Sequence, residues 1–225
     1  MSEFRAVLFD AGDTLIRLSG GGEELLHRAA AALGHDGLDS AGAARAWQEI
    51  LSRASTPEEL AKGRDLSADR HREVWTALYV DAGCERLASG LSEALYAVTV
   101  DARSWEAFPD TLSTLRALHG RGVRLGIVSD TGFDLRPVFD ALEMSAYLDA
   151  IVLSFQHGAC KPDPSVFLTA CDQLDVEPAE TLMVGDNPST DAGAVSAGLS
   201  VFLLPRPTLT GPRGLNHVLS LAPTL

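Results

Sequence analysis

Short apolar runs alternate along this chain with longer segments in which apolar residues recur at helical spacing. The short runs are continuously apolar and are bounded by Gly, Asp or Ser, a pattern typical of strands buried on both faces of a parallel sheet. They predict strands near Ala6–Phe9, Val123–Ser129, Ala150–Ser154, Thr181–Gly185 and Ser200–Leu204.

Helices are predicted between these strands, at Asp110–Arg121, Asp134–Leu142, Pro164–Leu174 and Thr190–Ala197. Pro164 suits a first helical turn, and Asp163 before it suits the N-cap. A regular alternation of strand and helix implies right-handed crossovers and a parallel sheet with helices on both faces. The predicted fold class is therefore α/β, with a Rossmann-like, doubly wound parallel sheet.

One interval breaks this alternation. Between Ile16 and Trp105 the spacing predicts helices only, at Glu23–Leu33, Ser40–Ala54, Pro57–Ala61, Ser67–Ala82 and Ser89–Val98. We therefore expect an α/β core from residues 1–16 and 105–225, with an all-helical cap inserted at 17–104. Inserted just after the first strand, the cap would stand over the strand ends, where it can exclude water and select substrates. A helical subdomain without a covering role is the simpler alternative.

The composition is that of a globular chain with a sizeable core, since 46% of its 225 residues are hydrophobic. No apolar run reaches the roughly 18 residues of a membrane helix and no signal-peptide pattern precedes the first strand, so a cytoplasmic protein is expected. A net charge of −13 without a basic block argues against nucleic acid as a partner. Cys84, Cys160 and Cys171 are odd in number and widely spaced, which predicts neither a disulfide framework nor a zinc site.

Polar side chains that suit phosphate chemistry lie at the ends of four predicted strands. Asp10 follows the first strand, and Ser129 and Asp130 lie at the end of the second. Lys161 follows the third strand, and Asp186 follows the fourth, with Asp191 five residues later. Three converging carboxylates repel one another unless a hard cation neutralises them, and oxygen ligands suit Mg²⁺. The Ser129 hydroxyl and the N–H groups of the turn at Asp130 can bind phosphate oxygens, and Lys161 supplies a positive charge. With the metal ion and the lysine present, Asp10 can attack phosphorus to form an aspartyl-phosphate.

Each of these residues taken singly has a simpler explanation. Asp10 and Asp186 suit turns or helix caps, Ser129 suits a strand end, and a lysine suits a solvated surface. Their occurrence at successive strand ends, in this order, favours a phosphoryl-transfer site.

The same residues lie in motifs that resemble those of the haloacid dehalogenase superfamily, with a helical cap inserted between the first and second motifs. FDAGDTL resembles the first motif, IVSD the second, the lysine of CKPDP the third, and VGDNPSTD the fourth, so that the resemblance covers essentially the whole chain. It implies a nucleophile, a Mg²⁺ site and phosphate contacts. The implied nucleophile is Asp10. The implied Mg²⁺ ligands are Asp10, the Gly12 carbonyl and Asp186, and Asp191 is either a further ligand or a support for the site. The implied phosphate contacts are Ser129 and Lys161.

The chain departs from the phosphatases of this superfamily at one position. They usually carry Asp two residues after the nucleophile, which protonates the leaving alkoxide and later deprotonates the hydrolytic water; here that residue is Gly12. The Gly12 carbonyl can still serve a metal ion, but loss of a positioned general acid–base typically costs about 10²–10⁴ in rate. Asp13 compensates only if the turn directs its carboxylate to the site; otherwise it caps the turn and faces the helical cap.

Two branches of the superfamily also lack that acid. Haloacid dehalogenases need no metal, and the retained Asp186 and Asp191 argue against that branch. Phosphonoacetaldehyde hydrolases keep Mg²⁺ and form a Schiff base on a cap lysine, for which Lys62 is the one candidate, although its context LAKGR does not resemble theirs. An alternative of another class is a phosphate- or partner-binding module with little turnover.

We favour a Mg²⁺-dependent phosphatase that acts on a small phosphorylated metabolite and prefers acyl or aryl phosphates, whose leaving groups depart without a proton. We expect no nucleic-acid or membrane partner, and a monomer or homodimer. The cap residues that can contact a substrate, or equally form a solvated helical surface, are Arg45, Arg53, Arg64, Arg70 and Trp75.

Overall fold

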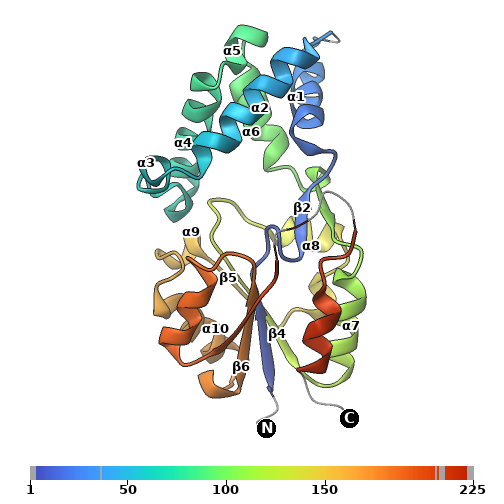
Figure 1. The fold of residues 1–225 in the computed structure, drawn as a ribbon, viewed down its shortest axis with the longest axis vertical. Coiled ribbons are helices and arrows are strands. Elements are labelled where there is room, and N and C mark those ends of the chain that lie inside the picture. The colour runs from blue at the N-terminus through green and yellow to red at the C-terminus, as the bar shows by residue number, and fades with distance from the viewer. Residues whose placement is uncertain (1–3, 36, 206, 208–210, 222–225) are drawn as a thin grey trace.

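The computed structural model describes residues 4–35, 37–205, 207 and 211–221, and these form an α/β body with a helical body above it in Figure 1. The described part of the α/β body contains a parallel sheet in the order β5-β4-β1-β6-β7. Its strands are β1 (Ala6–Phe9), β4 (Arg124–Ser129), β5 (Ala150–Leu153), β6 (Thr181–Gly185) and β7 (Ser200–Leu203). The predicted α/β fold class is confirmed, and the predicted strands differ from the observed ones by at most one residue at an end.

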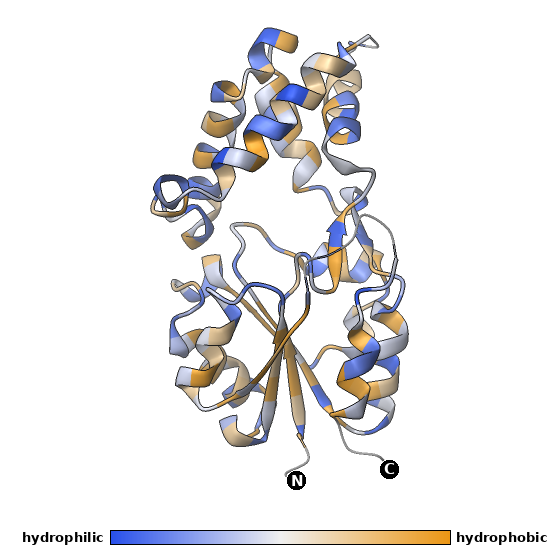
Figure 2. Cartoon of the chain, in the orientation of Figure 1, coloured by the Kyte–Doolittle hydropathy of each residue, from blue (hydrophilic) through white to orange (hydrophobic). Residues whose placement is uncertain are grey.

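Both faces of this sheet are covered, because successive side chains of a strand point to opposite faces. Val7 and Phe9 of β1 pack in one apolar cluster, which contains Phe139. Leu8 of the same strand packs in another cluster, which contains Phe167. The hydropathy colouring accordingly shows apolar strands between the layers of helices (Figure 2). Burial on both faces is the physical reason for the continuously apolar runs.

Helices from two parts of the chain carry the apolar residues of these clusters. Those on the Phe9 face are α7 (Thr111–Gly120), α8 (Arg136–Ala141) and the 3₁₀ helix η6 (Leu215–Ser220). Those on the Leu8 face are α10 (Pro164–Leu174) and the 3₁₀ helix η5 (Asp191–Ala197). Short turns of helix join the strands at η3 (Ser145–Tyr147), α9 (Ser154–His157) and η4 (Pro178–Glu180). The helix predicted at 190–197 is a 3₁₀ helix over Asp191–Ala197, and the poor helix former Gly193 lies inside it.

The helical body lies between two short strands, β2 (Ile16–Leu18) and β3 (Trp105–Ala107), which pair with each other antiparallel. It contains α1 (Gly21–Ala32), α2 (Ser40–Ala54), α3 (Pro57–Leu60), η1 (Arg64–Leu66), α4 (Ala68–Asp81), α5 (Cys84–Leu87), α6 (Leu91–Thr99) and η2 (Ala102–Ser104). It has an apolar cluster of its own, to which Leu25, Ile50 and Leu95 belong. The β2–β3 pair escaped prediction because both strands are three residues long and mostly half-buried, with Arg17 opposite Glu106.

The helical body touches the α/β body beside the end of β4. Ser154 Oγ donates a hydrogen bond to Asp65 O at 2.7 Å and accepts one from Thr131 N at 2.9 Å. A Cβ on Gly132 would lie 2.1 Å from His71 Cβ, so the core backbone and α4 are in direct contact there. These contacts lie at the carboxyl ends of the strands, the edge at which open α/β sheets bind their ligands. None of the helices in the described part of the chain has the length and apolarity that crossing a bilayer requires.

Candidate active site

Asp10 is the first residue beyond the central strand. Its backbone N–H donates to Val184 O at 2.9 Å, which continues the pairing of β1 with β6 and fixes where its side chain begins. The residue is 9% exposed. Because β1 lies between β4 and β6, the Asp10 carboxylate lies next to the residues that follow the carboxyl ends of those two strands.

Lys161 supplies the positive charge at this carboxylate. Its Nζ donates to Asp10 Oδ1 at 2.6 Å and to Asp191 Oδ1 at 2.7 Å, and its side chain is 3% exposed. Its backbone N–H donates to Asp130 Oδ1 at 2.9 Å, which ties the lysine loop to the end of β4. The lysine is therefore held from both ends, and a surface role for it is excluded.

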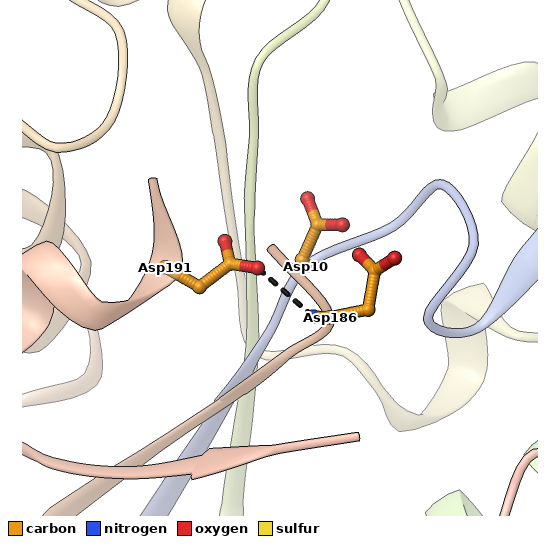
Figure 3. Close-up of side chains that lie close together, drawn as sticks. All are labelled: Asp10, Asp186 and Asp191. Carbon is orange, nitrogen blue, oxygen red and sulfur yellow. Dashed lines mark hydrogen bonds between the residues drawn. The ribbon is translucent and has the colours of Figure 1, made fainter. Parts of the chain in front are cut away.

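Asp186 and Asp191 complete the cluster from the end of β6. Asp191 Oδ2 accepts hydrogen bonds from the backbone N–H groups of Asp186 at 3.0 Å and Asn187 at 2.9 Å. Gly185 leaves room for this arrangement, since a Cβ there would lie 2.1 Å from the same oxygen. One carboxylate oxygen from each of Asp10, Asp186 and Asp191 lies within 4.8 Å of the others, as the convergence of the three side chains in Figure 3 illustrates.

The electrostatics of the cluster are those of crowded, buried carboxylates. Burial raises the pKa of Asp10 to about 6, against the lowering effect of Lys161 and with a further increase from the charge of Asp191. Burial and the negative charges of Asp13 and Asp191 also raise the pKa of Asp186. Burial opposes the charge of Lys161, but Asp10, Asp191 and Asp130 outweigh it and raise the pKa of the lysine. An oxygen-only donor set with excess negative charge fits a hard divalent cation such as Mg²⁺.

In the turn after β4, some of the groups that the sequence offers to a phosphate already form hydrogen bonds within the protein. Ser129 closes β4 opposite Leu153 of β5 and is 5% exposed. The Asp130 carboxylate accepts from Lys161 N, and burial raises its pKa to about 6. Because the Thr131 N–H already donates to Ser154 Oγ, it is not free for a phosphate oxygen.

The turn that follows Asp10 decides the direction of Asp13. Asp13 adopts the left-handed conformation with φ of 56°, which costs an L-residue energy that glycine avoids, and it is exposed. Its charge acts on Asp186 and is itself offset by Arg213 and Arg17. Gly12, by contrast, does not adopt a left-handed backbone conformation. A Cβ added to it would have no heavy atom within 4 Å.

Two residues of the site were missed by sequence analysis. Thr14 is fully buried, and its Oγ1 lies 3.4 Å from Asp10 Oδ2 and 3.5 Å from Asp186 Oδ1. Its place in FDAGDTL was the signal that could have found it. Arg213 is buried in the same region, and its Nη2 lies 4.0 Å from Asp186 Oδ2. It carried no signal, since it is one arginine in a Pro-rich segment.

The cap residues predicted as substrate contacts lie in different surroundings. Arg64 lies over the Trp75 ring, 4.6 Å from its centroid, and its neighbour Asp65 is the residue that contacts Ser154. The other three are exposed or half-exposed and ion-paired, Arg45 with Asp39, Arg53 with Glu49 and Asp81, and Arg70 with Glu73. Lys62 is also ion-paired, with Nζ 2.5 Å from Glu59 Oε1.

Comparison with known proteins finds a family model, curated relatives and solved structures that are similar to this chain. A model of the family described as haloacid dehalogenase-like hydrolase matches residues 4–198. A phosphoglycolate phosphatase of Nitrosospira multiformis is 32% identical over 182 residues, which are 74% of this chain and 76% of that protein. A (S)-2-haloacid dehalogenase of a Pseudomonas species is 34% identical over 101 residues, 44% of each chain. The solved structure of a HAD phosphatase from Thermococcus onnurineus is similar with a TM-score of 0.61 and 26% identity, over 96% of this chain and 97% of that one.

Proposed function

The chain belongs to the haloacid dehalogenase-like hydrolase family, and we propose that it is a Mg²⁺-dependent phosphatase acting on a small phosphorylated metabolite through an aspartyl-phosphate at Asp10. One observation carries this proposal: the Asp10 carboxylate lies 2.6 Å from Lys161 Nζ and in one cluster with Asp186 and Asp191. A nucleophile, a fixed cation and a set of metal-ligating oxygens are the parts that phosphoryl transfer requires. The similarity to a phosphoglycolate phosphatase supports the same class of substrate.

Asp10 performs the covalent steps of the proposed reaction. One of its carboxylate oxygens attacks phosphorus, the new O–P bond forms in line with the breaking P–O bond, and the leaving group departs as an anion. A water molecule then attacks phosphorus and the bond between Asp10 and phosphorus breaks. Both protons of the water stay with the phosphate, which departs as dihydrogen phosphate, and the Asp10 carboxylate is restored. Lys161 neutralises phosphate oxygens through both steps, and the Ser129 hydroxyl and the Asp130 N–H, but not the Thr131 N–H, offer further hydrogen bonds to them.

The residues at the site fit a magnesium ion. Asp10, the Gly12 carbonyl and Asp186 would hold it, and Asp191 is either a further ligand or the residue that positions Asp186 through its backbone N–H. When bound, Mg²⁺ would offset the negative charge of the phosphate and of the carboxylates that face it. Both oxygens of Asp191 already accept hydrogen bonds, which favours the positioning role.

The missing acid at position 12 restricts the substrates. A leaving alkoxide needs a proton, whereas an acyl or aryl leaving group departs as a stable anion, so we propose that the enzyme prefers the second kind. Asp13 is the remaining candidate for an acid or base. We assign it to the turn instead, because its backbone is left-handed and the charges that offset it belong to Arg213 and Arg17.

The proposal is tested by phosphate release from p-nitrophenyl phosphate and acetyl phosphate. We expect multiple turnovers with Mg²⁺, none after EDTA treatment, and none in Asp10→Asn, whose far-ultraviolet circular dichroism should match the wild type. Slow release of a single equivalent would show a phosphate-binding module instead. Two further assays address the other branches: halide release from a 2-haloacid without metal would indicate a dehalogenase, and turnover of phosphonoacetaldehyde that is lost in Lys62→Arg would indicate C–P bond hydrolysis.

A further inference from the structure

Arg213 reaches the carboxylate cluster from a segment that the proposed reaction does not use. Its side chain is 2% exposed, although it lies in the C-terminal segment beyond the last strand. Its Nη2 is buried and has no hydrogen-bond acceptor among the described residues. A buried guanidinium with an unused donor is costly, so its position calls for a charge partner.

The rest of the side chain is firmly anchored. Nε donates to Asp13 O at 2.5 Å, and Nη1 donates to Pro205 O. The backbone N–H of Arg213 donates to Asp110 Oδ1 at 2.7 Å, and those of Gly214 and Leu215 donate to Asp110 Oδ2 at 2.8 Å. The guanidinium therefore cannot swing toward a better acceptor without breaking these bonds.

Within the described part of the chain, the carboxylate that pairs with Nη2 is that of Asp186. The distance from Nη2 to Asp186 Oδ2 is 4.0 Å, which is an ion pair but too long for a hydrogen bond. Lys161 is engaged elsewhere, because its Nζ donates to Asp10 and Asp191. Among the described residues, Arg213 is the cation in an ion pair with Asp186, and its charge acts on this carboxylate more strongly than that of Lys161.

We propose that Arg213 is a positioning residue that serves as the internal counter-charge of Asp186, so that it competes with a divalent cation for this carboxylate. The inference rests on the proposed metal site. Its consequence is a weakened, readily exchanged metal ion, because a fixed positive charge a few ångströms away repels a doubly charged ion. It also explains why a buried arginine is tolerated here, since the negative charges of Asp186, Asp13 and Asp110 act on its guanidinium.

The test measures binding of Mn²⁺ and Mg²⁺ by isothermal titration calorimetry, without substrate. Removing one unit charge near a divalent ion, in a partly screened site, tightens binding on the order of tenfold. We therefore expect Arg213→Gln to bind either ion about tenfold more tightly than the wild type, and Arg213→Lys, which keeps the charge, to stay within about threefold of it. Arg121→Gln is the matched control, because Arg121 also anchors the C-terminal segment, through Leu219 O at 2.6 Å, away from the site.

Each outcome decides between a charge role and a purely structural one. Equal or weaker metal binding in Arg213→Gln overturns the inference while leaving the metal site intact, whereas failure of the wild type to bind either ion overturns the metal site itself. If Arg213→Gln does not fold in metal-free buffer, it is refolded in millimolar Mg²⁺. Recovery there, with unfolding on addition of EDTA, supports the counter-charge role, because the metal replaces the lost charge. Failure to fold in Mg²⁺ as well shows that Arg213 acts only as a structural anchor.

Discussion

Restoring the missing acid by Gly12→Asp is the sharpest test of how this site handles the leaving group. A Cβ at position 12 would meet no heavy atom within 4 Å, and the backbone there is not in the left-handed region. The Cβ of the new side chain therefore causes neither a steric clash nor backbone strain. Replacing glycine at a compatible position stabilises a fold by about 0.4–1 kcal/mol through the unfolded chain. Folding should not mask the catalytic effect.

The expected gain depends on the leaving group. A positioned general acid is worth about 10²–10⁴ in rate, or about 3–5 kcal/mol of barrier, when the leaving group needs a proton. We expect Gly12→Asp to raise kcat/KM for an alkyl phosphate, such as glycerol phosphate, by at least about tenfold, allowing for imperfect placement of the new carboxylate. For p-nitrophenyl phosphate, whose phenolate departs unaided, we expect a change of less than about threefold.

The assay is steady-state phosphate release from both substrates at saturating Mg²⁺. Gly12→Asn is the control, because it adds nearly the same volume without an acidic proton and should give none of the gain. An equal change on both substrates, or the same gain in Gly12→Asn, would refute the argument that a missing proton donor limits this enzyme.

Two further predictions follow from the turn and from the helical body. Asp13→Gly should leave phosphate release from glycerol phosphate within about threefold of the wild type, and a loss of 10²-fold or more would make Asp13 the proton shuttle. The same substitution should change the free energy of unfolding by no more than about 1 kcal/mol, because glycine tolerates the φ of 56° but removes a charge that offsets Arg213. His71 should make the free energy of unfolding pH-dependent, since burial and the charge of Arg64 lower its pKa to about 4. The unfolded chain then binds the extra proton between pH 6.5 and 4, so the contribution of His71 to stability is full above pH 6.5 and falls by up to about 1.4 kcal/mol per unit as the pH drops. Asp10 and Asp130 titrate in the same range in both proteins, so the measured quantity is the difference in unfolding free energy between the wild type and His71→Phe, from urea titrations at each pH. We expect this difference to change with pH between 6.5 and 4 in favour of His71→Phe as the pH drops, and a difference independent of pH would contradict the assignment.

The strands and the polar residues at their ends could be predicted because each depends on local pattern. A strand buried on both faces must be continuously apolar, and this identified β1, β4 and β6 within a residue of their ends. Parallel strands bring their carboxyl ends to one edge, so Asp10, Lys161 and Asp186 could be placed together in advance. The β2–β3 pair could not be found in this way, since its burial depends on the bodies it joins.

The amino-acid sequence by itself determined the α/β class, the family and the chemical types present at the strand ends. Tertiary structure alone decided how those groups are engaged. Lys161 is shared between Asp10 and Asp191, the Thr131 amide is already taken by Ser154, and Asp13 lies in a left-handed turn. Only the fold could bring Arg213 next to Asp186, because Arg213 follows no strand whose end would place it at the site. The contact arises from the anchoring of the C-terminal segment on Asp110.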